Sequence, residues 1–197
     1  AGGSTLFTNG GSYEVEVRAT DRAGNVSTRT DRFAIDRTPP TILLDPVTSP
    51  TRGPVVIRYR LNDNISPSNQ VAVLCNAPDC VGPLASSIGT FVVTNAGTNQ
   101  IVLTATDPAG NVSFATASFF VDNSPPLFGL APIPSPTRRS VLISYALFDN
   151  YSEIADIVVT GDAGPYSFDG VYAVPFTARD EAGNTTSRTA RFVIDKA

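Results

Sequence analysis

A short turn of nearly the same sequence occurs three times in the chain, and no other feature constrains the fold as strongly. The copies read ATDRAGN, ATDPAGN and ARDEAGN and occupy residues 19–25, 105–111 and 178–184. Each copy lies between two segments in which apolar and polar residues alternate, as they do in half-buried strands. An aspartate follows each copy, 11 residues after its last asparagine, at Asp36, Asp122 and Asp195. Repetition on this scale predicts a tandem array of small domains arranged end to end.

A second set of repeated motifs predicts where these domains begin and end. A double proline at 39–40 recurs 86 residues later at 125–126, and the sequence SPTR at 49–52 recurs at 135–138 with the same spacing. Proline cannot donate to a β-ladder, and a proline pair stiffens a connection. We therefore expect three domains: the C-terminal part of an incomplete domain over residues 1–37, and two full domains over 38–122 and 123–197.

Alternating patterns predict about seven short strands in each full domain. The expected strands are 55–61, 71–74, 89–94 and 100–106 in the first full domain, and 141–148, 157–160, 166–168 and 172–178 in the second. Tyr59 and Tyr145 occupy equivalent positions in these patterns, and we expect both in the core. Strand number and domain size predict an all-β fold of Greek-key β-sandwiches.

The incomplete domain is predicted to be a hairpin of strands 13–20 and 26–35. Val15 and Val17 on the first strand and Phe33 on the second are expected to point inward. A two-stranded hairpin is marginally stable alone in water. Either the sequence begins inside a domain, or the missing strands come from another chain.

The first full domain carries an insertion that contains both cysteines. The second and third turn aspartates are 73 residues apart, against 86 for the first and second, so 13 residues at approximately 75–88 are additional. The spacing of Cys75 and Cys80 is C-x4-C, which alone cannot supply four zinc ligands and does not match the redox motif C-x-x-C. We predict a local disulfide in an extracellular protein; the alternative is two reduced thiols in a loop.

Composition excludes several classes of function. A net charge of -4 and a single lysine, Lys196, argue against nucleic-acid binding. No apolar run approaches the ~20 residues of a membrane span. The sequence has no histidine, and therefore no Ser-His-Asp triad, Cys-His dyad or imidazole metal site. The absence of a signal peptide and an initiating methionine favours a mature region or a fragment of a longer protein.

The pattern A-T-D-x-A-G-N-x-S, followed by a strand that ends in aspartate and by a Pro-Pro linker, resembles bacterial immunoglobulin-like (Ig-like) repeat domains and the related hyalin-type repeats. The resemblance covers nearly the whole chain. It implies Ig-like sandwiches in a secreted or surface protein, often a stalk or an adhesin, with no common catalytic site.

In an Ig-like sandwich the incoming linker, the loop after the second strand and the loop between the last two strands meet at one end. This arrangement predicts two clusters of three carboxylates: Asp36, Asp63 and Asp107, and Asp122, Asp149 and Asp180. Carboxylates with nearby amides and carbonyls suit a hard cation such as Ca²⁺, which would offset their repulsion and stiffen the array. The alternative is that each aspartate caps a turn through its own backbone and that no cofactor is required.

Five asparagines stand in Asn-x-Ser/Thr sequons, which carry glycans in eukaryotic secreted proteins: Asn25, Asn64, Asn111, Asn150 and Asn184. Three of these lie in the repeated turn. We interpret those three as turn residues chosen because asparagine tolerates left-handed backbone angles.

The function that these observations favour is a non-enzymatic structural or spacer module of a bacterial surface or adhesin-type protein, located outside the cell. Its partners would be neighbouring Ig-like domains, copies of itself, or a host or cell-surface ligand. One alternative is a ligand- or carbohydrate-binding adhesive module that uses the 75–88 insertion, with Asn76, Asp79 and Tyr151 as contact candidates. Another is the subunit of an extracellular filament, completed by strand exchange through the N-terminal half domain.

Overall fold

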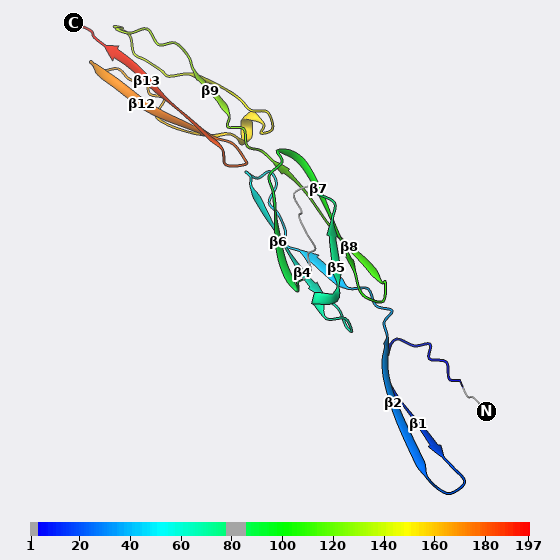
Figure 1. The fold of residues 1–197 in the computed structure, drawn as a ribbon. Helices are drawn as coiled ribbons and strands as arrows, with labels where there is room; N and C mark the ends of the chain where they lie inside the picture. Colours follow the sequence, from blue (N-terminus) through cyan, green and yellow to red (C-terminus); the bar gives the residue numbers. More distant parts are fainter. Residues whose placement is uncertain (1–3, 78–85) are drawn as a thin grey trace. The chain divides into compact units, whose positions relative to one another are not determined.

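A computed structural model describes residues 4–77 and 86–197 (Figure 1), and the predicted all-β class is confirmed. Apart from strands, these residues form two single turns of 3₁₀ helix, η1 (Ser68–Gln70) and η2 (Ile154–Asp156). Contacts divide the chain into two compact units: Ala1–Pro46, Val56–Val92 and Gln100–Ala117 form the first, and Val47–Val55, Val93–Asn99 and Ser118–Ala197 form the second. The domain boundaries drawn from the sequence stay predictions.

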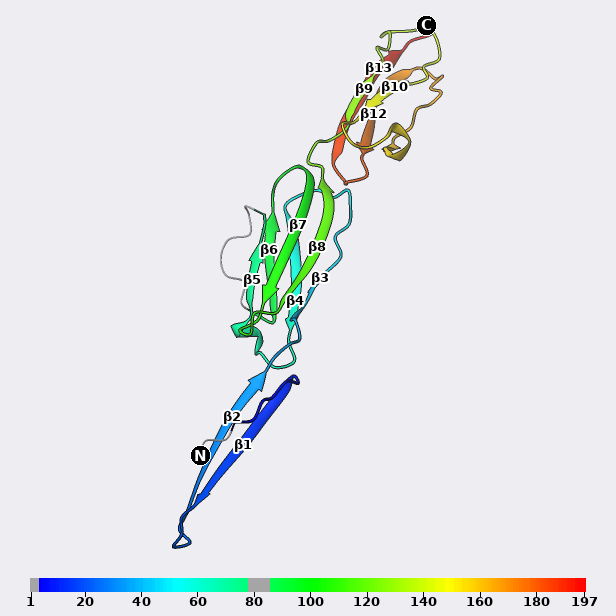
Figure 2. The same ribbon diagram turned by 90° about the vertical axis from the view of Figure 1, so that its right-hand side faces the viewer.

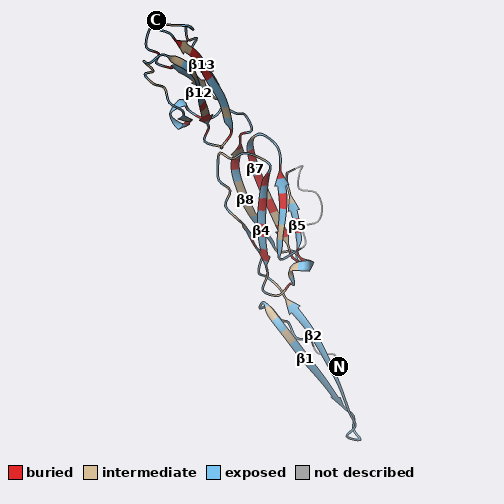
Figure 3. Ribbon diagram, turned by 90° about the vertical axis from the view of Figure 1, so that its left-hand side faces the viewer, coloured by how far each residue is buried: buried red, intermediate tan, exposed pale blue. Residues whose placement is uncertain are grey.

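The N-terminal hairpin has the predicted strands but not the predicted burial. Strands β1 (Gly11–Thr20) and β2 (Val26–Ile35) pair antiparallel over their whole length and pair with no other strand among the described residues. Val17 is 60% exposed and Phe33 39% exposed, so the expectation that they point into a core is wrong. Figure 3 shows no buried residue on either strand, because no second sheet covers this face.

An aromatic corner at the start of this hairpin recurs at the other end of the chain. The Tyr13 hydroxyl donates to the Asn9 carbonyl at 2.8 Å, and Tyr172 donates to the Phe168 carbonyl at the same distance. Both tyrosine rings stack on a phenylalanine of the neighbouring strand. A tyrosine that bonds a backbone carbonyl a few residues upstream is typical of Ig-like sandwiches, so the hairpin has the local structure of the end of such a domain.

Six strands in two sheets follow the hairpin (Figure 2). One sheet has the order β3-β4-β6, with β3 at Thr41–Leu44, β4 at Val55–Asn62 and β6 at Ile88–Val93. The other has the order β5-β7-β8, with β5 at Ala72–Cys75, β7 at Gly97–Thr106 and β8 at Val112–Val121. Every second residue of β4 is buried, as expected where two sheets pack face to face. Outside these strands, an isolated parallel bridge joins Thr51 to Val121.

The last five strands also form two sheets. One pairs β10 (Tyr145–Phe148) with β9 (Leu127–Leu130), and the other has the order β11-β12-β13, with β11 at Val158–Thr160, β12 at Gly170–Arg179 and β13 at Thr185–Ile194. The predicted strand 141–148 is shorter than expected, and 166–168 forms only an isolated bridge, between Tyr166 and Val141. The core comprises Phe128, Val141, Ile143, Ile157, Val174, Phe176, Ala178, Ala190, Phe192 and Ile194.

The two equivalent tyrosines differ in burial. Tyr59 is 1% exposed, and Gly89 of β6 lies so close to its ring that a Cβ at Gly89 would overlap the phenol. Tyr145 is 43% exposed, so the prediction that it is a core residue is wrong. Among the described residues the sheet of Tyr145 contains only β9 and β10, so it has no third strand in the position that β6 takes beside Tyr59.

The contact between Gly89 and Tyr59 predicts that Gly89→Ala destabilises the fold by about 1–3 kcal/mol, because added core volume forces side chains from their preferred rotamers. Thermal unfolding followed by circular dichroism measures the change. Gly129→Ala in β9 is the matched control, since a Cβ there meets no atom within 4 Å. Equal melting temperatures for the two variants would contradict the packing described.

Candidate metal sites at the Asp-Asn turns

The repeated turn is closed by the same hydrogen bonds in all three copies. In the second copy the Asn111 N–H donates to Asp107 Oδ1 at 2.9 Å, and Asn111 Nδ2 donates to Asp107 Oδ2 at 2.8 Å. The first and third copies repeat both bonds at 2.7–2.9 Å. Capping by the turn aspartate is therefore a feature of the structure, as the alternative interpretation expected.

The glycine of the turn, and not its asparagine, takes the left-handed backbone conformation. Gly24, Gly110 and Gly183 have φ angles of 88°, 88° and 92°, and no other residue type has a positive φ among the described residues. The prediction that asparagine is required for its backbone angles is wrong. Its side-chain amide is what the turn uses.

In the second and third copies this amide also holds the incoming linker. Asn111 Nδ2 donates to the Asp36 carbonyl at 3.3 Å. Asn184 Nδ2 donates to the carbonyls of Asp122 at 3.0 Å and Ser124 at 3.3 Å. The sequence offered only one signal for this role, the recurrence of the asparagine, because its linker partners lie 60 to 75 residues away.

The aspartate after the second strand of each full domain uses only one carboxylate oxygen. Asp63 Oδ1 accepts the N–H groups of Ile65 at 3.0 Å and Ser66 at 2.7 Å. Asp149 Oδ1 accepts the equivalent pair, from Tyr151 at 3.0 Å and Ser152 at 2.8 Å. In both residues Oδ2 is buried and has no hydrogen-bond partner in the part of the chain that the structure describes.

The linker aspartates also accept a backbone N–H group on Oδ1. Asp36 Oδ1 accepts the Thr38 N–H at 3.1 Å, and Asp122 Oδ1 accepts the Ser124 N–H at 2.9 Å. Asp122 is only 1% exposed, and its Oδ2 has no partner. A buried carboxylate oxygen without a donor is uncommon in a native structure and calls for an explanation.

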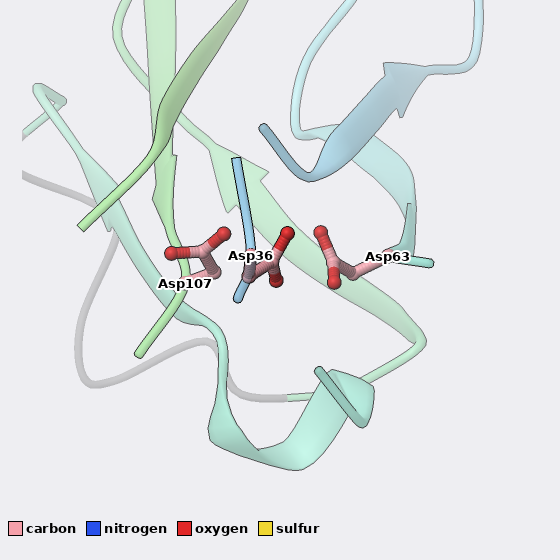
Figure 4. A group of neighbouring side chains, drawn as sticks. All are labelled: Asp36, Asp63 and Asp107. Carbon is pink, nitrogen blue, oxygen red and sulfur yellow. The ribbon is translucent and has the colours of Figure 1, made fainter. Parts of the chain in front are cut away.

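These aspartates form the two clusters that the sequence predicted. Figure 4 shows the carboxylates of Asp36, Asp63 and Asp107 turned toward a common space. In each cluster one oxygen from every carboxylate lies within 4.8 Å of the others; the second cluster comprises Asp122, Asp149 and Asp180. Each cluster falls within one compact unit. The structure thus places these residues together, and their role as metal ligands stays a prediction.

The environment shifts the pKa of two cluster members in opposite directions. Burial raises the pKa of Asp122, and the negative charges of Asp149 and Asp180 raise it further against the opposing Ser124 hydrogen bond. Burial also acts to raise the pKa of Asp107, but the hydrogen bonds from Asn111 and from the backbone N–H groups of the turn lower it overall. The environment of Asp107 therefore favours its ionised form, whereas the environment of Asp122 disfavours it.

The donor set suits a hard cation. Both clusters offer carboxylate oxygens and contain no sulfur or imidazole nitrogen. Ca²⁺ takes six to eight oxygen ligands in flexible geometry, and three carboxylates with backbone carbonyls and water can supply them. The unpartnered Oδ2 atoms of Asp63, Asp122 and Asp149 are the strongest candidates, since Asp107 and Asp180 already accept hydrogen bonds on both oxygens.

The contact candidates of the insertion are tested only in part. Asn76 bonds the backbone of β7, donating to the Gln100 carbonyl at 3.3 Å and accepting the Val102 N–H at 2.7 Å. Asp79 and Cys80 lie outside the described residues, so the disulfide from Cys75 stays a prediction. Tyr151 is 40% exposed and stacks on Phe120, with ring centroids 3.9 Å apart.

Comparison with protein families supports the interpretation of the repeats. Residues 2–37 and 138–196 match the sequence model of the bacterial Ig-like domain family. The matched segments make up slightly less than half of the chain, and they are similar in sequence to that family. The N-terminal match includes the hairpin β1–β2, so this hairpin is similar in sequence to part of a bacterial Ig-like domain. Such folds are generally non-enzymatic.

Several solved structures are distantly similar to the chain. A tetra-tandem repeat from the extending region of a large adhesion protein is 21% identical, with a TM-score of 0.36 over 95% of this chain and 57% of that one. The fibronectin(III)-like modules of Clostridium thermocellum CbhA are 14% identical, with a TM-score of 0.43 over 79% and 94%. Protocadherin gammaB7 EC3-6, in a cis-dimer structure, is 15% identical, with a TM-score of 0.38 over 93% and 58%. The chain therefore spans little more than half of the adhesion and protocadherin chains, and at these scores the likenesses support no inference on their own.

No curated protein is detectably similar to the sequence. In the part of the chain that the structure describes, no helix has the length and apolar character to cross a membrane.

The bonds of Asn184 predict that Asn184→Ala costs about 2–3 kcal/mol of unfolding free energy, because the buried carbonyl of Asp122 loses a donor. Chemical denaturation measures this change. Asn25→Ala is the matched control: Asn25 is exposed, and its amide bonds only the turn aspartate among the described residues, so a loss below about 1 kcal/mol is expected. Equal losses would show that the linker bonds contribute nothing.

Proposed function

We propose that this chain is a non-enzymatic spacer segment of a bacterial surface or adhesin-type protein, located outside the cell, and that calcium at the two acidic clusters holds each linker to the Ig-like domain that follows it. The chain's own residues perform this role through their positions, and no bond is made or broken. Its partners are the neighbouring Ig-like domains of the same polypeptide.

The observation that carries the calcium proposal is the unpartnered oxygen of Asp122. An acidic turn cap needs a partner for its oxygens, and Oδ1 of Asp122 has one in the Ser124 N–H. Oδ2 has no donor among the described residues although Asp122 is 1% exposed, and one carboxylate oxygen of Asp122 lies within 4.8 Å of oxygens from two further carboxylates. A cation supplies what this oxygen lacks.

Electrostatics set the scale of the effect. Two like charges about 5 Å apart repel by about 3 kcal/mol at an effective dielectric constant of ~20, and each cluster contains three such pairs when fully ionised. A divalent ion bound among them reverses the sign of these interactions. We expect the bound ion to contribute most to the attachment of the linker aspartate, Asp36 or Asp122, because this is the cluster member that lies outside the proposed following domain.

Calcium is expected to raise the melting temperature by on the order of 5 °C at a concentration tenfold above its dissociation constant, and EDTA to reverse the rise. Asp122→Asn is the decisive variant. Its amide can still accept from Ser124 and can donate to a neighbouring carboxylate, so the calcium-free protein becomes more stable while part of the calcium response is lost. Differential scanning calorimetry with and without calcium measures both effects.

Asp21→Asn serves as the control for this experiment. Asp21 caps the first turn with the same hydrogen bonds but belongs to neither cluster, so the full calcium response is expected to remain. If neither calcium nor EDTA changes the melting temperature of the wild-type protein, the calcium proposal is wrong and the aspartates serve only to cap turns. Replacing calcium with magnesium tests whether the site prefers the larger ion.

A second candidate function is that of a filament subunit, and the exposed face of the hairpin favours it. Val17 and Phe33 are 60% and 39% exposed, whereas the residues 159 positions later, Phe176 and Phe192, are each 2% exposed within a complete core. A strand set from another copy of the chain would cover the hairpin as β9–β11 and their loops cover β12 and β13. The adhesive alternative, with residues 75–88 as a binding loop, has no comparable support among the described residues.

The filament proposal predicts assembly that depends on concentration and on the hairpin face. Sedimentation velocity from about 1 to 100 μM is expected to show growing oligomers for the wild type, and Val17→Lys is expected to keep the chain monomeric because it places a charge in the covered face. Val112→Lys, at an exposed position of β8, is the control. A monomer at every concentration would exclude this function and leave the spacer function unaffected.

A further inference from the structure

We infer that the two clusters bind calcium unequally: the second (Asp122, Asp149 and Asp180) fills at lower calcium concentration and releases its ion slowly, and the first (Asp36, Asp63 and Asp107) fills only at higher concentration. This inference rests on the calcium sites proposed above and concerns the order in which they load. Three differences between otherwise equivalent residues carry it.

The first difference is the number of buried carboxylate oxygens that have no hydrogen-bond partner among the described residues. The second cluster has two, Asp122 Oδ2 and Asp149 Oδ2. The first has one, Asp63 Oδ2, because Asp36 Oδ2 accepts the Ser66 hydroxyl at 3.4 Å. An ion at the first cluster has to compete with that hydrogen bond, and the ion-free state of the first cluster is correspondingly less strained.

The serine equivalent to Ser66 makes the contrast clear. Ser152 follows Asp149 at the same spacing, and its hydroxyl oxygen accepts the Glu181 N–H at 3.2 Å. This bond links the loop of Ser152 to the loop of Glu181, and Ser152 makes no bond to the carboxylate of Asp122 among the described residues. The same residue type thus satisfies the linker aspartate at one cluster and not at the other.

The second difference is how firmly the linker is held before any ion binds. Asn184 Nδ2 reaches two linker carbonyls, at 3.0 and 3.3 Å, whereas Asn111 Nδ2 reaches one, at 3.3 Å. Asn184 is 3% exposed, and Asn111 is only half-buried. A ligand that is already positioned loses less conformational freedom on binding, so preorganisation favours the second cluster.

The third difference is the cover beside each cluster. Phe120, two residues before Asp122, stacks on Tyr151, two residues after Asp149, with ring centroids 3.9 Å apart. The equivalent positions in the first cluster are Ala34 and Ile65. A surface pocket adjoins each cluster, of about 350 Å³ beside Asp36 and about 330 Å³ beside Asp149, so the difference in cover is confined to the aromatic pair. The aromatic pair covers one side of the second cluster, and the first cluster has small or aliphatic side chains at the equivalent positions, so the second is expected to lose its ion more slowly.

Unequal sites would give the two linkers different behaviour in the same medium. Calcium-binding modules outside the cell have dissociation constants of about 0.1–1 mM, close to the concentrations around them. A first cluster at the weak end of this range would leave its linker free when calcium falls, while the second cluster stayed loaded. The segment would then respond to calcium in two steps.

The test uses the equivalent substitutions Asp63→Asn and Asp149→Asn, each of which disables one cluster and leaves the other. Isothermal titration calorimetry of the full chain with Ca²⁺ is expected to give the Asp63→Asn variant a dissociation constant at least ~10-fold lower than that of the Asp149→Asn variant. Stopped-flow mixing of the calcium-loaded proteins with a fluorescent chelator is expected to show slow release from Asp63→Asn and fast release from Asp149→Asn. Circular dichroism confirms that each variant is folded.

The possible outcomes separate the two proposals. Two sites of equal affinity and equal release rate, or the reverse order, would overturn this inference and leave the calcium function intact. A wild type that binds no calcium would overturn both. If Asp149→Asn fails to fold, the double variant Phe120→Ala/Tyr151→Ile in the otherwise wild-type chain decides the question: loss of the slow phase of release supports the inference, and an unchanged slow phase overturns it.

Discussion

The side-chain amide of the turn asparagine is the interaction on which the arrangement of both clusters depends. One Nδ2 group serves the turn aspartate and the linker carbonyl together, so it closes the hairpin and positions the linker in a single contact. At the third turn this group is 3% exposed, and it brings Asp122 to a place where almost no water reaches it. The first turn has the same internal bonds without a linker, and there the asparagine is exposed. The turn therefore forms by itself, and the linker is added to it.

The strand framework could be predicted from the sequence because its information is local. The alternation of side chains between two faces places strand boundaries within a few residues, and Val26–Ile35 agrees with the structure at both ends. Repetition supplied the register between copies, which brought all six cluster aspartates to the correct loops. The function of the asparagine could not be predicted in this way. Its linker partners are far away in the sequence, and the turn offered a sufficient local explanation in the backbone angle, which belongs to the neighbouring glycine.

The assumption that equivalent positions share one environment failed where the copies differ in length. Tyr59 is buried because its ring packs against Gly89 of β6, the neighbouring strand of the same sheet. The second full copy has 13 fewer residues in this region, and the same tyrosine pattern leaves Tyr145 43% exposed. The hairpin β1–β2 shows the same principle on a larger scale. Apolar and polar residues alternate along β1 as they do in a strand with one buried face. Whether that face is buried depends on other strands that pack on it, and the alternation within β1 gives no information about those strands.

Turn capping and ion binding are compatible functions of the same aspartates, because the two oxygens of each linker and loop carboxylate are used differently. Oδ1 of Asp63, Asp122 and Asp149 accepts backbone N–H groups, which asparagine could also achieve. The charge is needed only for Oδ2, and there it is unfavourable without a counter-ion, since a buried and unpaired ionised group costs free energy. The capping function alone accounts for a polar residue at these positions, but not for three acids in a cluster, twice in one chain. A cation is the simplest group that turns this repeated electrostatic cost into a stabilising interaction.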